Sequence, residues 1–104
     1  MINEITVETL QKEMEQKTII LIDVRENDEY EYCKIQGSMH IPMNDIPVRI
    51  KEISIDNSYA VICHTGVRSG MVCNYLKNIG YNAVNVIGGI DKWSESIDNK
   101  VKKY

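Results

Sequence analysis

The sequence has no excess of positive charge and no long apolar run. Its 12 Lys and Arg are outnumbered by 15 Asp and Glu, for a net charge of -3. This balance argues against nucleic-acid binding, which needs a concentrated basic patch. No apolar stretch reaches membrane-spanning length, and residues 1–11 lack the charged segment and apolar run of a signal peptide. We therefore expect a cytoplasmic protein that binds neither nucleic acid nor membranes, and we interpret Lys100, Lys102 and Lys103 as a solvated end.

Cysteine, proline and glycine are too sparse to suggest a zinc site or a linker. The three cysteines, Cys33, Cys63 and Cys73, are odd in number and match no zinc-binding spacing. A reducing compartment would keep them as thiols. The two prolines and six glycines are scattered, and 104 residues suffice for one core. We expect a single domain over residues 1–104, without a metal site.

Short apolar runs alternate with helical patterns along the chain. The expected strands cover residues 5–7, 19–22, 39–41, 59–62 and 82–87, and the expected helices cover residues 27–32, 44–53, 69–79 and 90–96. Thr6 is also a candidate N-cap for a helix over residues 7–17, and Asn27 or Asp28 is a candidate cap for the short helix that ends at Tyr32. The alternation predicts an α/β fold, with a mostly parallel sheet flanked by helices on both faces. Asp23 and Cys63 each follow a strand, so we expect both at the ligand-binding edge of the sheet.

The residues after the strand over 59–62 are suited to a reactive thiol. Cys63 faces the start of a helix, whose free N–H groups and partial positive charge favour thiolate over thiol. Successive N–H groups of the loop could surround an anion, and Gly66 permits the backbone conformation that this needs. Arg68 adds a permanent positive charge, and His64 adds one near neutral pH. We expect a lowered pKa at Cys63, and an anionic group carried on its sulfur.

Five segments stand in the order and spacing of one known family. They are DVRENDEY (23–30), IQGSMHIP (35–42), VICHTGVRS (61–69), LKNIGY (76–81) and GGIDKW (88–93). Together they cover nearly the whole chain, and it resembles a single-domain rhodanese-like sulfurtransferase. The resemblance implies a five-stranded parallel sheet flanked by helices.

The resemblance also implies an enzyme that moves a sulfane sulfur through a persulfide on Cys63, the catalytic nucleophile. Its donor would be thiosulfate or a persulfide, and its acceptor cyanide, a thiol or a protein cysteine. No metal or organic cofactor is needed. The implied substrate-binding residues are His64, Thr65, Gly66, Val67 and Arg68. The expected supports of the loop are Asp23, Arg25 and Ser69.

Two other functions stay open. One is a sulfur-carrier module that serves a desulfurase and a partner protein without turnover on small donors. The other is phosphatase or arsenate chemistry, which the loop length disfavours: rhodanese-like phosphatases have one residue more than the four, His64 to Val67, between Cys and Arg. The chain also departs from the family by having Cys33–Lys34 where Gly-His is common, and His64 where arginine is common. His64 is either a substrate contact or a solvated loop residue.

Several residues have ordinary structural interpretations. We expect Cys73 in the core and Cys33 at a helix end, partly exposed, although a relay role for either thiol stays open. His40 is expected to be a hydrogen-bonded structural histidine. Asp23 and Arg25 are expected to form an ion pair that braces the loop and takes no part in the chemistry.

Overall fold

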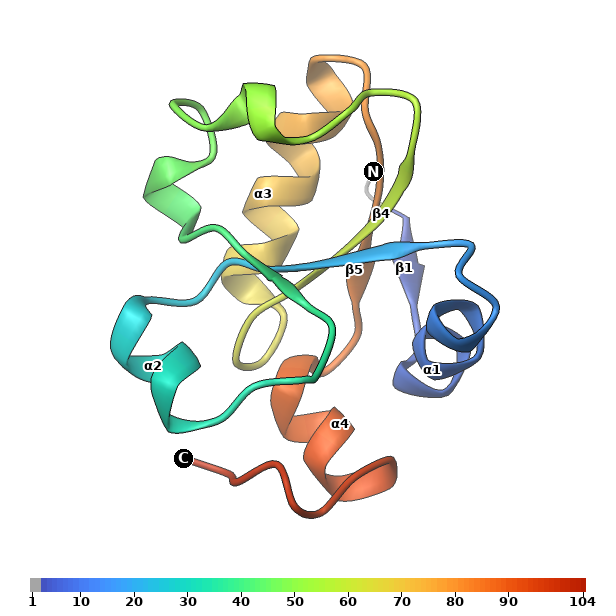
Figure 1. The fold of residues 1–104 in the computed structure, drawn as a ribbon, viewed down its shortest axis with the longest axis vertical. Helices are drawn as coiled ribbons and strands as arrows, with labels where there is room; N and C mark the ends of the chain where they lie inside the picture. The colour runs from blue at the N-terminus through green and yellow to red at the C-terminus, as the bar shows by residue number, and fades with distance from the viewer. Residues whose placement is uncertain (1–2) are drawn as a thin grey trace.

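Five short strands form one sheet in which every neighbouring pair is parallel. The computed structural model describes residues 3–104. Along the sheet the strands follow the order β1 (Glu4–Ile5), β5 (Asn82–Val86), β4 (Ser58–Ile62), β2 (Ile20–Asp23) and β3 (Met39–His40). Helical segments separate successive strands along the chain (Figure 1). The predicted α/β fold with its parallel sheet is confirmed.

Helices cover both faces of this sheet (Figure 1). One layer holds α3 (Val67–Asn78) with the 3-10 helices η1 (Met43–Asp45) and η2 (Ile50–Glu52), and the other holds α1 (Val7–Glu15) and α4 (Gly89–Ser96). Successive β4 residues enter opposite cores: Tyr59 and Val61 pack on the α3 side, and Ala60 and Ile62 on the α4 side. Burial on both faces explains the continuous apolar sequence of this strand. None of the helices in residues 3–104 has the length and hydropathy of a transmembrane segment.

The prediction of a helix over residues 44–53 is wrong. The chain instead forms η1 and η2 with turns between them. Pro47 has no N–H to donate to the preceding turn, and the β-branched residues around it disfavour a helix. Ile46 and Ile53 are still buried, whereas Val48 is 85% exposed. The apolar pattern therefore identified Ile46 and Ile53 as core residues, but it was wrong for Val48 and for the backbone conformation.

Of three helix starts, one agrees with the expectation and two differ in detail. Thr6 caps α1, and its hydroxyl accepts a hydrogen bond from the Thr9 N–H, so the N-cap interpretation is confirmed. The cap of α2 (Asn27–Tyr32) is Glu26, not Asn27 or Asp28. Helix α3 begins at Val67, two residues before the expected start at Ser69.

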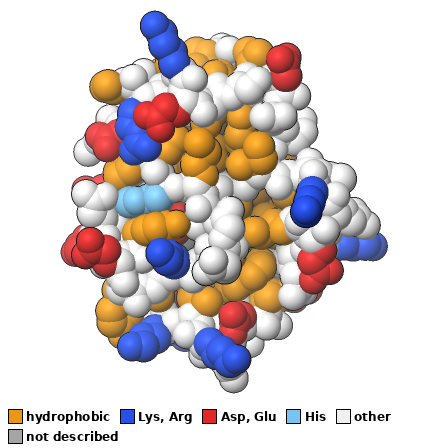
Figure 2. All heavy atoms as spheres, viewed as in Figure 1, with side chains coloured by type: hydrophobic (Ala, Val, Ile, Leu, Met, Phe, Trp, Pro, Cys, Tyr) orange, Lys and Arg blue, Asp and Glu red, His pale blue; other side chains and the backbone are white. Residues whose placement is uncertain are grey.

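The end of the chain packs back onto the protein. Val101 is buried, the Ser94 hydroxyl donates to its carbonyl, and Lys103 pairs with Glu95. The three C-terminal lysines are exposed, as expected of a solvated end, although Val101 between them packs onto the protein. Lys and Arg side chains are interspersed with Asp and Glu on the face in Figure 2, where they form no single cluster.

Candidate active site

Asp23 and Cys63 lie at the same edge of the sheet, as expected. The register pairs Asp23 with Ile62, so Cys63 follows directly at the C-terminal end of β4. A loop of residues 64–66 then leads into α3. Gly66 has φ 113°, in the left-handed region that side chains rarely adopt. This turn lets α3 begin beside the Cys63 sulfur.

The Cys63 thiol is 1% exposed and accepts two hydrogen bonds. The Gly66 N–H lies 3.2 Å from Sγ, and the Ser69 hydroxyl 3.3 Å. Burial is the largest single influence on the pKa of this thiol and raises it. Hydrogen bonds from the Ser69 hydroxyl and from backbone N–H groups of the loop together outweigh burial, so the net pKa lies below its usual value. This is the direction expected from the sequence.

Asn85 of β5 holds the loop in place and was not identified from the sequence. Its side-chain N–H donates to the Gly66 carbonyl at 3.0 Å, and its oxygen lies within hydrogen-bond distance of the Ser69 hydroxyl, so Asn85 and Cys63 Sγ share the single proton of that hydroxyl. Asn85 is buried, in a strand that is otherwise apolar at its buried positions. That polar interruption of an apolar strand was the available signal.

The start of α4 packs against the other side of the loop. The Ile90 N–H donates to the Cys63 carbonyl at 2.9 Å, and the Asp91 N–H donates to the His64 carbonyl at 3.2 Å. A Cβ on Gly89 would lie 2.6 Å from the Cys63 carbonyl oxygen. The glycine therefore has a packing role: it lets the backbone of α4 approach the loop closely.

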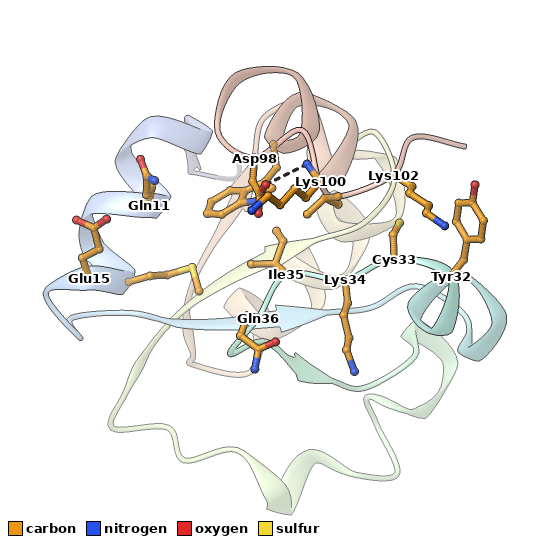
Figure 3. A pocket seen from close by; sticks show the side chains of 13 residues that line it. Gln11, Glu15, Tyr32, Cys33, Lys34, Ile35, Gln36, Asp98, Lys100 and Lys102 are labelled. Carbon is orange, nitrogen blue, oxygen red and sulfur yellow. Dashed lines mark hydrogen bonds between the residues drawn. The ribbon is translucent and has the colours of Figure 1, made fainter.

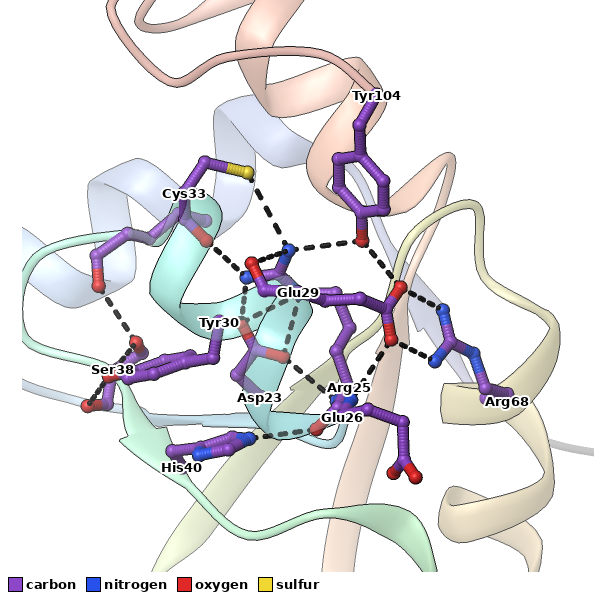
Figure 4. Close-up of polar contacts among 11 residues, drawn as sticks. Asp23, Arg25, Glu26, Glu29, Tyr30, Cys33, Ser38, His40, Arg68 and Tyr104 are labelled. Carbon is purple, nitrogen blue, oxygen red and sulfur yellow. Dashed lines mark hydrogen bonds and ion pairs between the residues drawn. The ribbon is translucent and has the colours of Figure 1, made fainter.

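Arg68 is engaged by a carboxylate that sequence reasoning missed. Its two terminal nitrogens donate to the two oxygens of Glu29, at 2.6 and 2.8 Å (Figure 4). Glu29 lies on α2 and also accepts from the Glu26 N–H and from the Tyr104 hydroxyl. The hydrogen bond from Arg68 is the main cause that lowers the pKa of Glu29 to about 2. Arg68 therefore forms a bidentate ion pair within the folded chain.

His64 is also engaged by neighbouring side chains. Its Nε2 lies 3.0 Å from Oδ1 of Asp91, and its ring stacks on Tyr104 with centroids 3.9 Å apart. The Tyr104 hydroxyl accepts a hydrogen bond from Arg25 and donates one to Glu29. Burial raises the pKa of Tyr104 to about 12, so this hydroxyl keeps its proton at neutral pH. The sequence suggested that His64 is either a solvated loop residue or a substrate contact. Neither interpretation predicted its contacts with Asp91 and Tyr104.

Asp23 and Arg25 form the expected ion pair, with 2.8 Å between Arg25 Nη2 and Asp23 Oδ2, and both side chains are buried. Arg25 also donates to the carbonyls of Glu29 and Cys33 (Figure 4). The pair thus braces α2 directly, and reaches the loop through Glu29 and Arg68 and through Tyr104 and His64.

Two of the loop residues turn their side chains outward. Val67 is 71% exposed and Thr65 is also exposed. His40 Nε2 donates a hydrogen bond to the Arg25 carbonyl at 2.7 Å, and its ring stacks on Tyr30, which confirms its structural role. Within residues 3–104, no three or more His, Cys, Asp or Glu side chains are grouped to hold a metal ion.

Comparison with known proteins decides the family. Residues 6–96 match the model of the rhodanese-like domain. The chain belongs to the rhodanese-like domain family. A provisionally named sulfurtransferase of Bacillus subtilis, YtwF, is 40% identical over 93 residues, which cover 88% of this chain and 90% of YtwF.

Two further similarities concern function and fold. YrkF of Bacillus subtilis, provisionally named a sulfur carrier protein, is 34% identical over 95 residues, which cover 89% of this chain and 51% of YrkF. The crystal structure of a rhodanese-like domain protein from Staphylococcus aureus is 32% identical, with a TM-score of 0.86 and 99% of each chain covered. The family and these names support sulfur transfer as the general chemistry of the chain.

The two other thiols of this rhodanese-like domain lie away from the loop donors. Cys73 is fully buried in the α3 core, where burial raises its pKa to about 12. Cys33 is 8% exposed, so the expected partial exposure is wrong. It is one of the residues around a cavity of about 550 Å³ between α1, the end of α2 and the C-terminal segment (Figure 3). Cys63 does not line this cavity.

Proposed function

We propose that this chain is a sulfurtransferase in which Cys63 carries the transferred sulfur as a persulfide. The observation that supports this proposal most is the position of Cys63 Sγ. It lies within hydrogen-bond distance of the Gly66 N–H and the Ser69 hydroxyl. Donors in this arrangement stabilise a thiolate before the reaction and an anionic persulfide after it.

In the first half-reaction, the Cys63 thiolate attacks the outer sulfur of thiosulfate or of a persulfide. A new S–S bond forms at Cys63 Sγ. The donor's own S–S bond breaks, and its electron pair leaves with sulfite or with a thiolate. No external oxidant or reductant is required. The N–H groups of residues 64–69 then hold the outer sulfur, and Arg68 and His64 line the approach to it.

In the second half-reaction, an acceptor such as cyanide, a thiol or a protein cysteine attacks the outer sulfur. The bond to Cys63 Sγ breaks and the thiolate is restored. Asp23 and Arg25 support the site by fixing α2, and Ser69 supports it by donating to Sγ. In this proposal, His64, Thr65, Gly66, Val67 and Arg68 form the binding loop.

Thiocyanate formation from a sulfur donor and cyanide tests this proposal. We expect the purified chain to form thiocyanate, and Cys63→Ser to reduce the rate to that of the uncatalysed reaction. Cys73→Ser is the matched control, because it removes a buried thiol from the same core without touching the loop donors. Equal activity in Cys63→Ser and in the unmodified chain would refute the proposal.

A sulfur-carrier role is the second candidate. It is favoured by the similarity to YrkF and by the carboxylate that occupies Arg68, the residue expected to attract small anions. Fast loading of Cys63 by a cysteine desulfurase, with negligible turnover of thiosulfate, would identify this role. Comparable rates with both donors would favour the enzyme.

A further inference from the structure

The two basic residues of the loop both lie beside carboxylates. Arg68 is paired with Glu29 through two hydrogen bonds, and His64 Nε2 lies 3.0 Å from Asp91. The sulfur of Cys63 becomes a third negative charge when it ionises. Taken together, these five groups carry at least as much negative as positive charge. This balance is unfavourable for the binding of a dianion such as thiosulfate.

Glu29 is fixed in this position by several partners and is not a mobile surface acid. Its Oε1 accepts from the Glu26 N–H at 2.9 Å, and its Oε2 accepts from the Tyr104 hydroxyl at 2.8 Å. Its backbone carbonyl accepts from the buried Arg25 at 3.2 Å. Figure 4 shows Glu29 between Tyr104 and Arg68. The side chain is only 18% exposed, so water screens its charge incompletely.

We propose that Glu29 sets the charge of the donor that Cys63 accepts, favouring a neutral or singly charged sulfane sulfur compound over the thiosulfate dianion. Thiol persulfides and thiosulfonates are donors of this class. With a thiosulfonate, the Cys63 thiolate bonds to the sulfane sulfur, the bond from that sulfur to the sulfonyl sulfur breaks, and sulfinate leaves with the electron pair. The inference rests on the proposed function of Cys63.

Glu29 acts here through Arg68 and is a specificity-determining residue, not a catalytic one. A dianionic donor must compete with a carboxylate that already binds both terminal nitrogens of the Arg68 guanidinium. A donor that reacts at a sulfur of low charge does not need those positions. Removing the charge of Glu29 while keeping its shape should therefore help the dianion more than the monoanion.

Thiosulfate and methanethiosulfonate form a suitable pair of probes, because both present a sulfane sulfur on a sulfonyl group but differ by one charge. The variant is Glu29→Gln, and kcat/KM is measured with each donor and cyanide. We expect kcat/KM to rise on the order of tenfold for thiosulfate and about threefold for methanethiosulfonate, because Coulomb energy scales with donor charge. Glu31→Gln is the matched control: it removes the same charge from an exposed position of α2.

The inference is decided by the ratio of kcat/KM for thiosulfate to kcat/KM for methanethiosulfonate. A ratio that rises about threefold in Glu29→Gln and stays constant in Glu31→Gln supports it. An unchanged ratio in Glu29→Gln, or an equal rise in both variants, overturns it. A purely structural role of Glu29 would lower both rates together and leave the ratio constant.

A second measurement needs no variant and covers the case in which Glu29→Gln does not fold. In the unmodified chain, kcat/KM for thiosulfate should stay constant or rise when salt increases from about 20 to about 200 mM, because screening weakens repulsion. A fall would show net attraction and overturn the inference. If neither donor loads Cys63, the proposed function fails and this inference with it, whereas loading by both with an unchanged ratio overturns the inference alone.

Discussion

At Cys63, two opposing influences act on one thiol. Burial disfavours the thiolate, and the hydrogen bonds from Ser69 and the loop N–H groups favour it. The balance lowers the pKa, although the side chain is almost fully buried. An inert core cysteine such as Cys73 shows the same burial without the donors, and there the pKa rises to about 12.

The rate of alkylation of Cys63 by iodoacetamide should therefore show a midpoint below the free-thiol value of about 8.5 when it is measured against pH. Ser69→Ala should move this midpoint upward, because it removes the side-chain donor to Sγ. Ser58→Ala is a control at the first residue of β4, at the opposite end of the strand from Cys63. A midpoint at or above about 8.5 in the unmodified chain would contradict this account of the site.

The free energy of unfolding should fall in acid as Glu29 becomes protonated. Its pKa is lowered to about 2 in the folded state from a usual value of 4.5, chiefly by Arg68. The stabilisation is therefore complete above about pH 4.5 and is lost as the pH falls toward 2. It amounts to on the order of 2 kcal/mol after allowance for partial solvent screening.

Urea unfolding at pH 7 and pH 3 checks this coupling. The fall in the free energy of unfolding between the two pH values should be smaller in Glu29→Gln than in the unmodified chain. Glu31→Gln should behave like the unmodified chain. An identical fall in all three proteins would show that the Glu29–Arg68 pair contributes nothing to stability.

Among the elements, the start of α4 makes the closest backbone approach to the loop. Gly89→Ala should lower the free energy of unfolding by at least about 2 kcal/mol, because its Cβ would meet the Cys63 and His64 carbonyls and its φ is 60°. It should also reduce thiocyanate formation by displacing the loop. Gly37→Ala is the control that has the backbone strain but not the steric clash. Gly37 has φ 87°, and nothing lies within 4 Å of the added Cβ.

Gly37→Ala should cost only about 1 kcal/mol and leave the activity unchanged. Equal losses of stability and activity in the two variants would show that the close approach of α4 to the loop is unimportant. Both free energies can be measured by urea unfolding at pH 7, where Glu29 is fully ionised in each protein.

The elements also show what the sequence could predict. Apolar runs such as residues 59–62, alternating with helical patterns, were sufficient to predict the strands, a mostly parallel sheet and the edge that holds Asp23 and Cys63. The 3-10 helices around Pro47 were missed, because periodicity reports which residues are buried and not which backbone hydrogen bonds form. Glu29 and Asn85 were missed because their partners lie 39 and 16–19 residues away, a separation that no local pattern encodes.

At the scale of the whole molecule, alkylation of the three thiols distinguishes the native protein from the unfolded one. All three thiols are buried, but only Cys63 has the loop donors that favour its thiolate. We expect Cys63 to be alkylated in the native protein, and Cys73 and Cys33, which lie outside that loop, to react only after unfolding. If residues 1–104 form a single domain, Cys33 and Cys73 should become reactive at the same urea concentration. Mass mapping of alkylated peptides across a urea series measures this, and separate midpoints for the two thiols would contradict a single cooperative unit.

The central claim is that Cys63 carries the sulfur, and one measurement tests it directly. The purified chain is incubated with methanethiosulfonate or thiosulfate, and its mass is recorded before and after alkylation and peptide mapping. We predict the addition of one sulfur atom, located on Cys63, and its removal by cyanide. Sulfur found on Cys33 or Cys73 instead, or no added mass with any donor, would contradict the claim.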